Sequence, residues 1–302
     1  MLREYRLLRQ KLIAYAELVR VHNLVVALFT TYTGYAIVYR ALHANLGLDQ
    51  WFPLIAAVVV LVAAGGYAIN DYFDREIDAI NKPERPIPSG RVSPHEALLI
   101  SIVVCIAGLA IALLIGSLTF TYAFVNALLV YTYSWKLKRT GLPGNLVIAF
   151  NSASSIVFGG LAYAELVRVW HHFNTVIVVS IIAFLLVLAR EFVKGVEDYV
   201  GDKAHGVRTL AVTLGPKKAS LIALITVLIV AIISPLPYLL GLYNTAYLVL
   251  AAIVDTIALY STLKLVCSSD PIREAARTRR TLKICFLLGA IAFIVGLVPS
   301  LQ

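Results

Sequence analysis

Three aspartates in the stretch NDYFDREID recur at the spacing of a single helix face. Asp71, Asp74 and Asp78 stand at positions i, i+3 and i+7. Because each helical residue advances by roughly 100°, their carboxylates project to the same side. Like charges this close are stable only when a cation lies among them. Asn70, which directly precedes Asp71, can add an amide oxygen. The stretch therefore predicts a cation site built from oxygen atoms.

A second acidic pair follows in the stretch EDYVGDKAHG. Asp198 and Asp202 are one helical turn apart and share a face. Oxygen-only ligand sets suit a hard cation such as Mg²⁺, which commonly bridges protein carboxylates to substrate phosphates. Five carboxylates are more than one ion needs, so we expect two or more Mg²⁺ ions around a diphosphate. The alternative is that both acidic clusters only pair with local lysines and arginines.

Basic residues accompany the acidic stretches and could neutralise phosphate oxygens. The candidates for binding a diphosphate or another part of the substrate are Lys82, Arg85, Lys136, Lys138, Arg190 and Lys194. Three prolines in NKPERPIPSG predict a stiff, extended loop after the first acidic stretch. Such a loop would hold Lys82 and Arg85 in place.

Long apolar runs surround these polar stretches. Of the 302 residues, 60% are hydrophobic and only 14% are charged, which is typical of a polytopic helical membrane protein. We predict an all-α fold in which nine transmembrane helices form a bundle around a central cavity with a polar cap. The nine predicted spans are 18–40, 52–73, 95–116, 119–135, 144–163, 173–195, 217–240, 243–266 and 281–299.

The basic residues also predict how the chain lies in the membrane. Of the 26 lysines and arginines, 24 fall in the N-terminal segment or in alternate connections between the spans. By the positive-inside rule these segments are cytoplasmic, with the N-terminus inside and the C-terminus outside. All five aspartates then lie at cytoplasmic ends of spans, so we expect the site to face the cytoplasm. The net charge of +9 is spread over connections rather than one face, and we expect no nucleic-acid partner.

The chain is predicted to be a single membrane domain covering residues 1–302. Asp71 and Asp198 occupy similar stretches 127 residues apart, which suggests a repeat of helices 1–4 in helices 5–8, followed by helix 9. The three cysteines offer neither a disulfide framework nor a zinc spacing. No obligate protein partner is evident from the sequence.

The two acidic stretches resemble the motifs of a known family. NDYFDREID resembles the NDxxDxxxD motif of the UbiA superfamily of intramembrane prenyltransferases, and DYVGD resembles its second motif, DxxxD. Within the superfamily, the loop through NKPERPIPSG is similar to that of the archaeal ether-lipid enzymes, the digeranylgeranylglyceryl phosphate synthases. RVHN at 20–23 is similar to the start of their first span, although His22 replaces the usual proline.

The resemblance implies a reaction and its participants. A magnesium-dependent enzyme would transfer a geranylgeranyl group from geranylgeranyl diphosphate to the free hydroxyl of geranylgeranylglyceryl phosphate, a lipid-like acceptor, through an allylic cation. Asp71, Asp74, Asp78, Asp198 and Asp202 would be catalytic metal ligands. Asn70 would assist them and Asn23 would bind the diphosphate. Other residues that could line the cavity are Arg20, His22, Tyr67, Tyr131 and Tyr133. Of the basic residues, Arg20, Lys136 and Lys138 could contact the acceptor phosphate.

Two other functions stay open from the sequence. A prenyltransferase with an aromatic acceptor, of the hydroxybenzoate or naphthoate type, would carry the same motifs because they bind the donor diphosphate. A membrane transporter would place its polar site near the bilayer midplane, where this chain offers only Asp255. An intramembrane acid is a candidate functional group, but we interpret Asp255 as a structural acid because it lies far from the cytoplasmic end.

Overall fold

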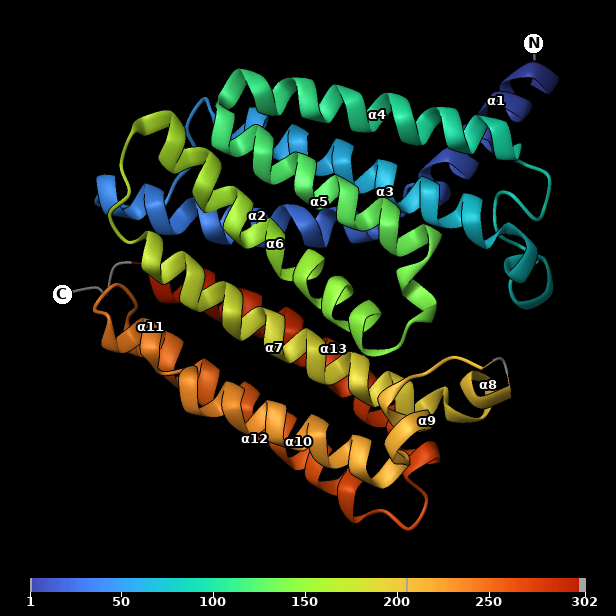
Figure 1. Cartoon of the computed structure of the whole chain (residues 1–302). Coiled ribbons are helices and arrows are strands. Elements are labelled where there is room, and N and C mark those ends of the chain that lie inside the picture. Colours follow the sequence, from blue (N-terminus) through green and yellow to red (C-terminus); the bar gives the residue numbers. More distant parts are fainter. Residues whose placement is uncertain (1, 205, 299–302) are drawn as a thin grey trace.

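A computed structural model describes residues 2–204 and 206–298, and these residues form helices and connecting turns without a β-strand. The long helices run side by side through the molecule (Figure 1). Their bounds, with those of the short helices between them, are α1 Leu2–Leu18, α2 Val21–Leu42, α3 Phe52–Asn81, α4 Pro94–Ile115, α5 Ser117–Trp135, η1 Leu137–Arg139, α6 Leu142–Val167, α7 Phe173–Glu197, α8 Tyr199–Ala204, α9 Leu210–Leu214, α10 Pro216–Ile233, α11 Leu236–Leu239, α12 Thr245–Cys267 and α13 Pro271–Leu297.

Eight of the helices in the described part of the chain are long and apolar enough to cross a membrane. They are α2, α3, α4, α6, α7, α10 with α11, α12 and α13. The remaining predicted span, 119–135, coincides with α5, which has 19 residues but a sequence richer in threonine, tyrosine and asparagine. The all-helical prediction is therefore confirmed, with eight helices that meet the requirements of a membrane span.

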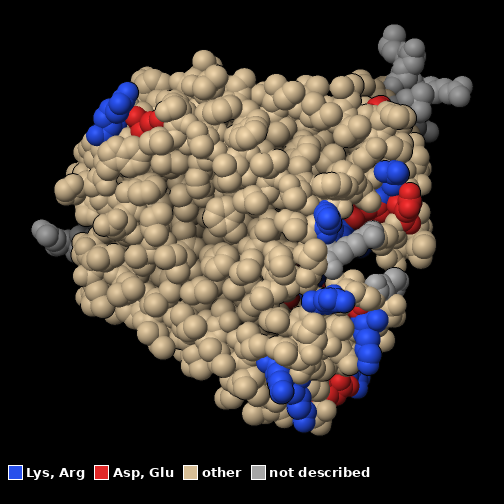
Figure 2. Space-filling model, in the orientation of Figure 1, with Lys and Arg blue, Asp and Glu red and all other residues tan. Residues whose placement is uncertain are grey.

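The connections divide between the two ends of the bundle. Figure 1 shows α1, the α3–α4 connection, η1, α8 and α9 at one end, and the C-terminus at the other. We call the first of these the motif end, because α3 and α7 both finish there with their acidic stretches. In Figure 2 most of the charged side chains visible on the molecule gather at this end. The remainder of the visible surface is largely uncharged.

Helix α7 is the centre of the bundle. It packs against α6, α10 and α13, and 67% of its apolar window is buried, compared with 28% to 50% for the other spanning helices. Further pairs form around it, with α3 on α4, α2 on α6 and α12 on α13. The helix that carries the second acidic stretch is therefore fixed from several sides.

Helices α2 and α6 cross with their backbones in close contact. A Cβ atom on Gly34 would overlap the carbonyl oxygen of Ile156, and one on Gly159 would overlap the carbonyl oxygen of Thr31. Beside this crossing, the hydroxyls of Thr30 and Ser155 form a hydrogen bond of 2.7 Å. Small residues permit such an approach and are typical of helix packing inside membranes. The crossing fixes α2, whose first turns approach the first acidic stretch.

Residues 82–93 connect α3 to α4 and form what we call the cap loop. The prediction of an extended loop is wrong, because this segment folds into consecutive turns. The amide of Ser89 donates to the carbonyl of Arg85 at 2.9 Å, and the amide of Val92 donates to that of Pro86 at 3.0 Å. The φ angle of proline suits tight turns as well as extended chain. The loop is anchored to the protein, since Ile87 and Val92 are buried against α1, α3 and α4.

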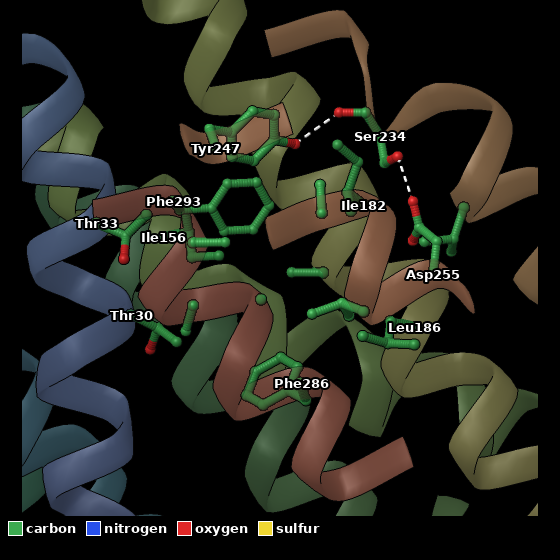
Figure 3. Close-up of a pocket in the computed structure, with 17 residues that line it drawn as sticks. Thr30, Thr33, Ile156, Ile182, Leu186, Ser234, Tyr247, Asp255, Phe286 and Phe293 are labelled. Atoms are coloured by element: carbon green, nitrogen blue, oxygen red, sulfur yellow. Dashed lines mark hydrogen bonds between the residues drawn. The ribbon is translucent and has the colours of Figure 1, made fainter. Parts of the chain in front are cut away.

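A small cavity of about 40 Å³ lies within the bundle between α2, α6, α7, α10, α12 and α13 (Figure 3). Its wall is mostly apolar, with a polar edge where α10 gives way to α11. There the Ser234 hydroxyl donates to Asp255 Oδ2 at 2.5 Å, and the Tyr247 hydroxyl donates to the Ser234 carbonyl at 2.6 Å. Asp255 thus binds the residue at the break between two helices, as expected for a structural acid.

Candidate active site

The first acidic stretch lies on the last turns of α3, which continues past its apolar run to Asn81. Asp71, Asp74 and Asp78 are only 4%, 8% and 5% exposed. The predicted shared face therefore exists and is turned into the protein. Carboxylates this deeply buried need charge compensation or hydrogen bonds, because burial removes the water that would otherwise stabilise them.

Three basic side chains supply that compensation. Arg20 Nη2 lies 2.6 Å from Asp71 Oδ1, and Arg85 Nη1 lies 3.3 Å from the same oxygen. Arg85 also pairs with Asp78, and Lys138 pairs with Asp74. The Asn70 amide donates to Asp74 Oδ2 at 3.1 Å. Residues from four segments therefore meet at one buried cluster, which we call the α3 carboxylate cluster: Asn70, Asp71, Asp74, Asp78, Arg20, Arg85 and Lys138.

Arg20 reaches the cluster through the geometry of a helix junction. It joins α1 to α2 with a left-handed backbone, φ 53°, which is uncommon outside glycine and asparagine. Its guanidinium carbon lies 5.2 Å from the centre of the Tyr67 ring, within the range of a cation–π contact. The Asn23 side chain interacts with the Tyr67 hydroxyl. Three residues predicted separately, Arg20, Asn23 and Tyr67, therefore form one wall beside Asp71.

Tyr133 of α5 lies near both this cluster and the end of α7. It lies near enough to both Asp74 and Glu191 to interact with their charges. Glu191 is buried, and its Oε1 lies 3.1 Å from Arg190 Nη2. Glu191 is not among the predicted site residues, although it precedes Asp198 by seven residues and so shares its helix face. The helical spacing that groups the aspartates of α3 would therefore also have predicted Glu191.

The second acidic stretch lies at the same end of the bundle but closer to solvent. Asp198 ends α7 with its side chain 46% exposed, and its Oδ2 lies 3.8 Å from Lys194 Nζ. Asp202 follows in the short helix α8. Among the described residues, no group of three or more His, Cys, Asp or Glu side chains is arranged to hold a metal ion. The structure thus brings the two stretches to one end without joining their carboxylates.

The remaining predicted site residues lie around or outside the cluster. Lys82 is exposed where α3 ends, Lys136 is exposed where α5 ends, and His22 is exposed at the start of α2. The Tyr131 hydroxyl forms a 2.6 Å hydrogen bond with the Ser101 hydroxyl and donates to the Ser101 carbonyl at 3.0 Å. Tyr131 therefore joins α5 to α4.

The chemistry of the cluster fits a hard divalent cation and an anionic substrate. Its acceptors are carboxylate and amide oxygens, which are the ligands Mg²⁺ prefers. Its donors are two guanidinium groups and an ammonium group, which bind phosphate oxygens well. The buried carboxylates lie against the partly buried basic groups, so a magnesium-bound diphosphate could replace the pairing between them.

Comparison with known proteins places this geometry in a family. The model of the UbiA prenyltransferase family matches residues 27–289. The chain belongs to the UbiA prenyltransferase family. The resemblance of the two motifs is thereby confirmed, and the chain is a prenyltransferase and an integral membrane protein.

Individual relatives are similar over nearly the whole length. The chain is 47% identical over 289 residues to the digeranylgeranylglyceryl phosphate synthase of Hyperthermus butylicus, covering 93% of this chain and 95% of that one. It is 43% identical to the synthase of the same name from Ignicoccus hospitalis, covering 94% and 92%.

Solved structures share the fold. One described as concerning digeranylgeranylglyceryl phosphate synthase in membranes superposes with a TM-score of 0.80 at 36% identity, covering 95% of this chain and 98% of that one. A UbiA homologue from Archaeoglobus fulgidus, bound to GPP and Mg²⁺, superposes with a TM-score of 0.60 at 18% identity, covering 93% and 100%. The second comparison supports the fold alone.

Proposed function

We propose that the protein transfers a geranylgeranyl group from geranylgeranyl diphosphate to the free hydroxyl of geranylgeranylglyceryl phosphate, in the synthesis of archaeal ether lipids. The observation that carries the proposal is the buried α3 carboxylate cluster, in which Asp71, Asp74 and Asp78 meet three cations. Relatives that bear the name of this synthase at up to 47% identity over nearly the full chain support the choice of acceptor.

The donor diphosphate would bind at the cluster. Asp71, Asp74 and Asp78 would hold Mg²⁺ with help from Asn70, and Asp198 and Asp202 would complete the ligand set from α7 and α8. We propose two or more ions, because five carboxylates exceed the need of one. The metal supplies neutralisation of the charge that develops on the leaving diphosphate.

The cations of the chain would bind the phosphate oxygens. Arg85 and Lys138 already lie against the carboxylates, so a short movement would bring them to a diphosphate held there. The predicted contacts from Lys82, Arg190, Lys194 and Asn23 would add to them. Stabilising the leaving group lowers the barrier for breaking the bond between C1 and oxygen. The electron pair stays on the diphosphate, and C1 becomes an allylic cation.

The acceptor hydroxyl would then attack C1, form the ether bond and lose its proton. The acceptor carries its own phosphate, for which Arg20, Lys136 and Lys138 are the proposed contacts. Tyr67, which lies beside Arg20, and Tyr133, which lies near Asp74, would face the cation. Tyr131 and His22 are the other proposed residues of the cavity wall. A dry apolar cavity that opens towards the lipid would protect the cation from water.

We further propose nine spans, with α5 as the least apolar of them, a cytoplasmic N-terminus and an external C-terminus. The gathering of charged side chains at the motif end supports this orientation. The site would then face the cytoplasm, where a water-soluble diphosphate group can enter while the isoprenoid tails stay in the membrane.

An assay with purified protein in lipid vesicles tests the proposal. With Mg²⁺ and geranylgeranyl diphosphate present, we expect diphosphate release only when geranylgeranylglyceryl phosphate is added. Parallel reactions with 4-hydroxybenzoate and with a dihydroxynaphthoate serve as controls. Turnover of an aromatic acid in place of the glyceryl lipid would contradict the proposed acceptor. Release of diphosphate in the absence of any acceptor would contradict the transfer itself.

A further inference from the structure

Helix α1 has two separate apolar faces. On one face, Ala14 and Leu18 are fully buried and belong to the same apolar cluster as Ile87 and Val92 of the cap loop. On the other face, Tyr5, Leu8 and Leu12 follow the i, i+3, i+7 spacing of a helical stripe and are 69%, 60% and 59% exposed. We call these three residues the α1 stripe. The first face explains how α1 attaches to the protein, and the stripe needs a different explanation.

The position of α1 indicates what covers the stripe. Its sequence LREYRLLRQKLIAYAEL contains too many charged residues for a membrane span, and it is absent from the spanning set. It ends three residues before α2 begins its passage through the membrane. It also lies at the motif end, where the charged side chains gather (Figures 1 and 2). The helix therefore lies at the level where the bilayer meets water, with the exposed Arg9 beside the stripe.

We propose that α1 lies in the surface of the phospholipid bilayer, with Tyr5, Leu8 and Leu12 buried among the upper acyl chains. An amphipathic helix with basic residues on its polar face is suited to this location, and tyrosine is enriched at membrane–water interfaces. In water the stripe would expose three large apolar side chains side by side. Within the bilayer surface the same side chains are removed from water while Arg9 stays near the lipid phosphates.

The proposed contact of α1 with the bilayer would also hold in place the segments around the α3 carboxylate cluster. Lys11 Nζ lies 2.8 Å from Glu96 Oε1 of α4 and donates to the carbonyl of Arg91 at 3.2 Å. Glu17 Oε2 lies 2.6 Å from Arg91 Nη2 of the cap loop. The next residues of the chain lead to Arg20, which binds Asp71. The bilayer surface, α1, the cap loop and the carboxylate cluster are thus joined by direct contacts.

Spin labelling of the full-length protein tests the location without relying on the enzymatic activity. Cys105 and Cys285 are buried and Cys267 is exposed, so the starting variant is Cys267→Ser. Leu8→Cys places a nitroxide on the stripe, and Gln10→Cys places one on the exposed opposite side of α1 as the matched control. Both proteins are reconstituted in vesicles of phosphatidylcholine and phosphatidylglycerol. Collision of the label with dissolved oxygen is then compared with collision with a water-soluble nickel chelate.

We expect the ratio of oxygen to nickel accessibility to be several-fold higher at position 8 than at position 10, because oxygen concentrates in the acyl region. Equal ratios at the two positions would overturn the proposal. Dipolar coupling between labels at position 8 of different molecules would overturn it as well, because the stripe would then be covered by a second copy of the chain. Both labelled positions are exposed, so neither substitution removes a buried contact.

Discussion

Asp71, Asp74 and Asp78 are nearly fully buried, yet each lies against a basic side chain from another part of the sequence. A buried carboxylate alone is costly, and a buried pair is stable only when geometry and hydrogen bonds compensate the lost hydration. The charges of the cluster therefore balance one another, and under the proposed function a magnesium-bound diphosphate would replace the pairing between them. The acidic residues of the cluster are expected to hold the metal, and the basic residues are expected to balance their charge. Two sets of substitutions test these two roles separately.

Asp71→Asn tests the acidic members. The substitution preserves shape but removes the charge that would hold Mg²⁺, so we expect turnover to fall by at least about 100-fold, as for the loss of other groups that stabilise a developing charge. The measurement is diphosphate release, with thermal unfolding in detergent as the check on folding. Glu76→Gln is the matched control, because Glu76 lies on the same helix with its side chain 86% exposed. Equal turnover of the two variants would refute the assignment.

The pair of Lys138 and Asp74 tests the charge balance. Lys138→Met leaves Asp74 buried without its cation, so we expect a loss of stability of about 1–3 kcal/mol. Adding Asp74→Asn to the same protein should restore most of that stability, since no uncompensated charge is left, although turnover should stay low. Unfolding of the single and double variants in a double-mutant cycle measures the coupling. Additive effects would show that the two side chains do not depend on each other.

The elements differ in how they position these residues. α3 carries its three aspartates on one continuous helix, so local geometry alone aligns them. Arg20 and Lys138 instead depend on where α2 begins and where α5 ends, and both points depend on packing. The contact between α2 and α6, in which Gly34 and Gly159 bring two backbones together, therefore matters for a site that it does not touch.

Gly34→Ala tests the crossing of α2 and α6. The added methyl group would overlap the carbonyl of Ile156 and force the helices apart, at a cost of about 1–3 kcal/mol. We expect a lower unfolding temperature together with reduced turnover. Gly289→Ala is the control, because its added methyl group would meet no atom within 4 Å. A crossing that tolerates alanine at position 34 as well as position 289 would contradict the close approach.

Across the molecule as a whole, charge is unevenly distributed: on the face shown in Figure 2, most charged side chains gather at the motif end and few lie at the other end. Both acidic stretches, α1 and the cap loop lie at the charged end, so a single orientation in the membrane determines which compartment supplies the donor. The cysteines allow this orientation to be measured directly, since Cys267 ends α12 at the motif end and is exposed.

Labelling with a membrane-impermeant thiol reagent tests the orientation. In intact cells that express the protein, we expect Cys267 to react only after the membrane is permeabilised, because the motif end faces the cytoplasm in the proposed topology. His171→Cys, at the opposite end between α6 and α7, is the control and should react in intact cells. Reaction of Cys267 from the outside would reverse the proposed topology.

The sequence by itself determined the helical membrane fold and the family. Apolar runs long enough to cross a bilayer permit little else than helices, and a helix aligns Asp71, Asp74 and Asp78 whatever surrounds it. The predicted span 119–135 stays a prediction, because α5 is not among the eight helices apolar enough to cross a membrane. The sequence spacing also places Glu191 and Asp198 on one helix face. Only the structure shows that Glu191 is buried at that end of α7.

Tertiary structure decided which distant residues meet. The partners of the aspartates come from positions 20, 85 and 138, and no local spacing relates these to α3. The turns of the cap loop, the contact of Tyr131 with Ser101 and the solvent exposure of Asp198 likewise follow from packing between helices. Proline restricts the backbone but does not select turns over extended chain. A tyrosine near a motif, such as Tyr131, can contact either of the helices beside its own. Contacts between segments far apart in sequence made those choices.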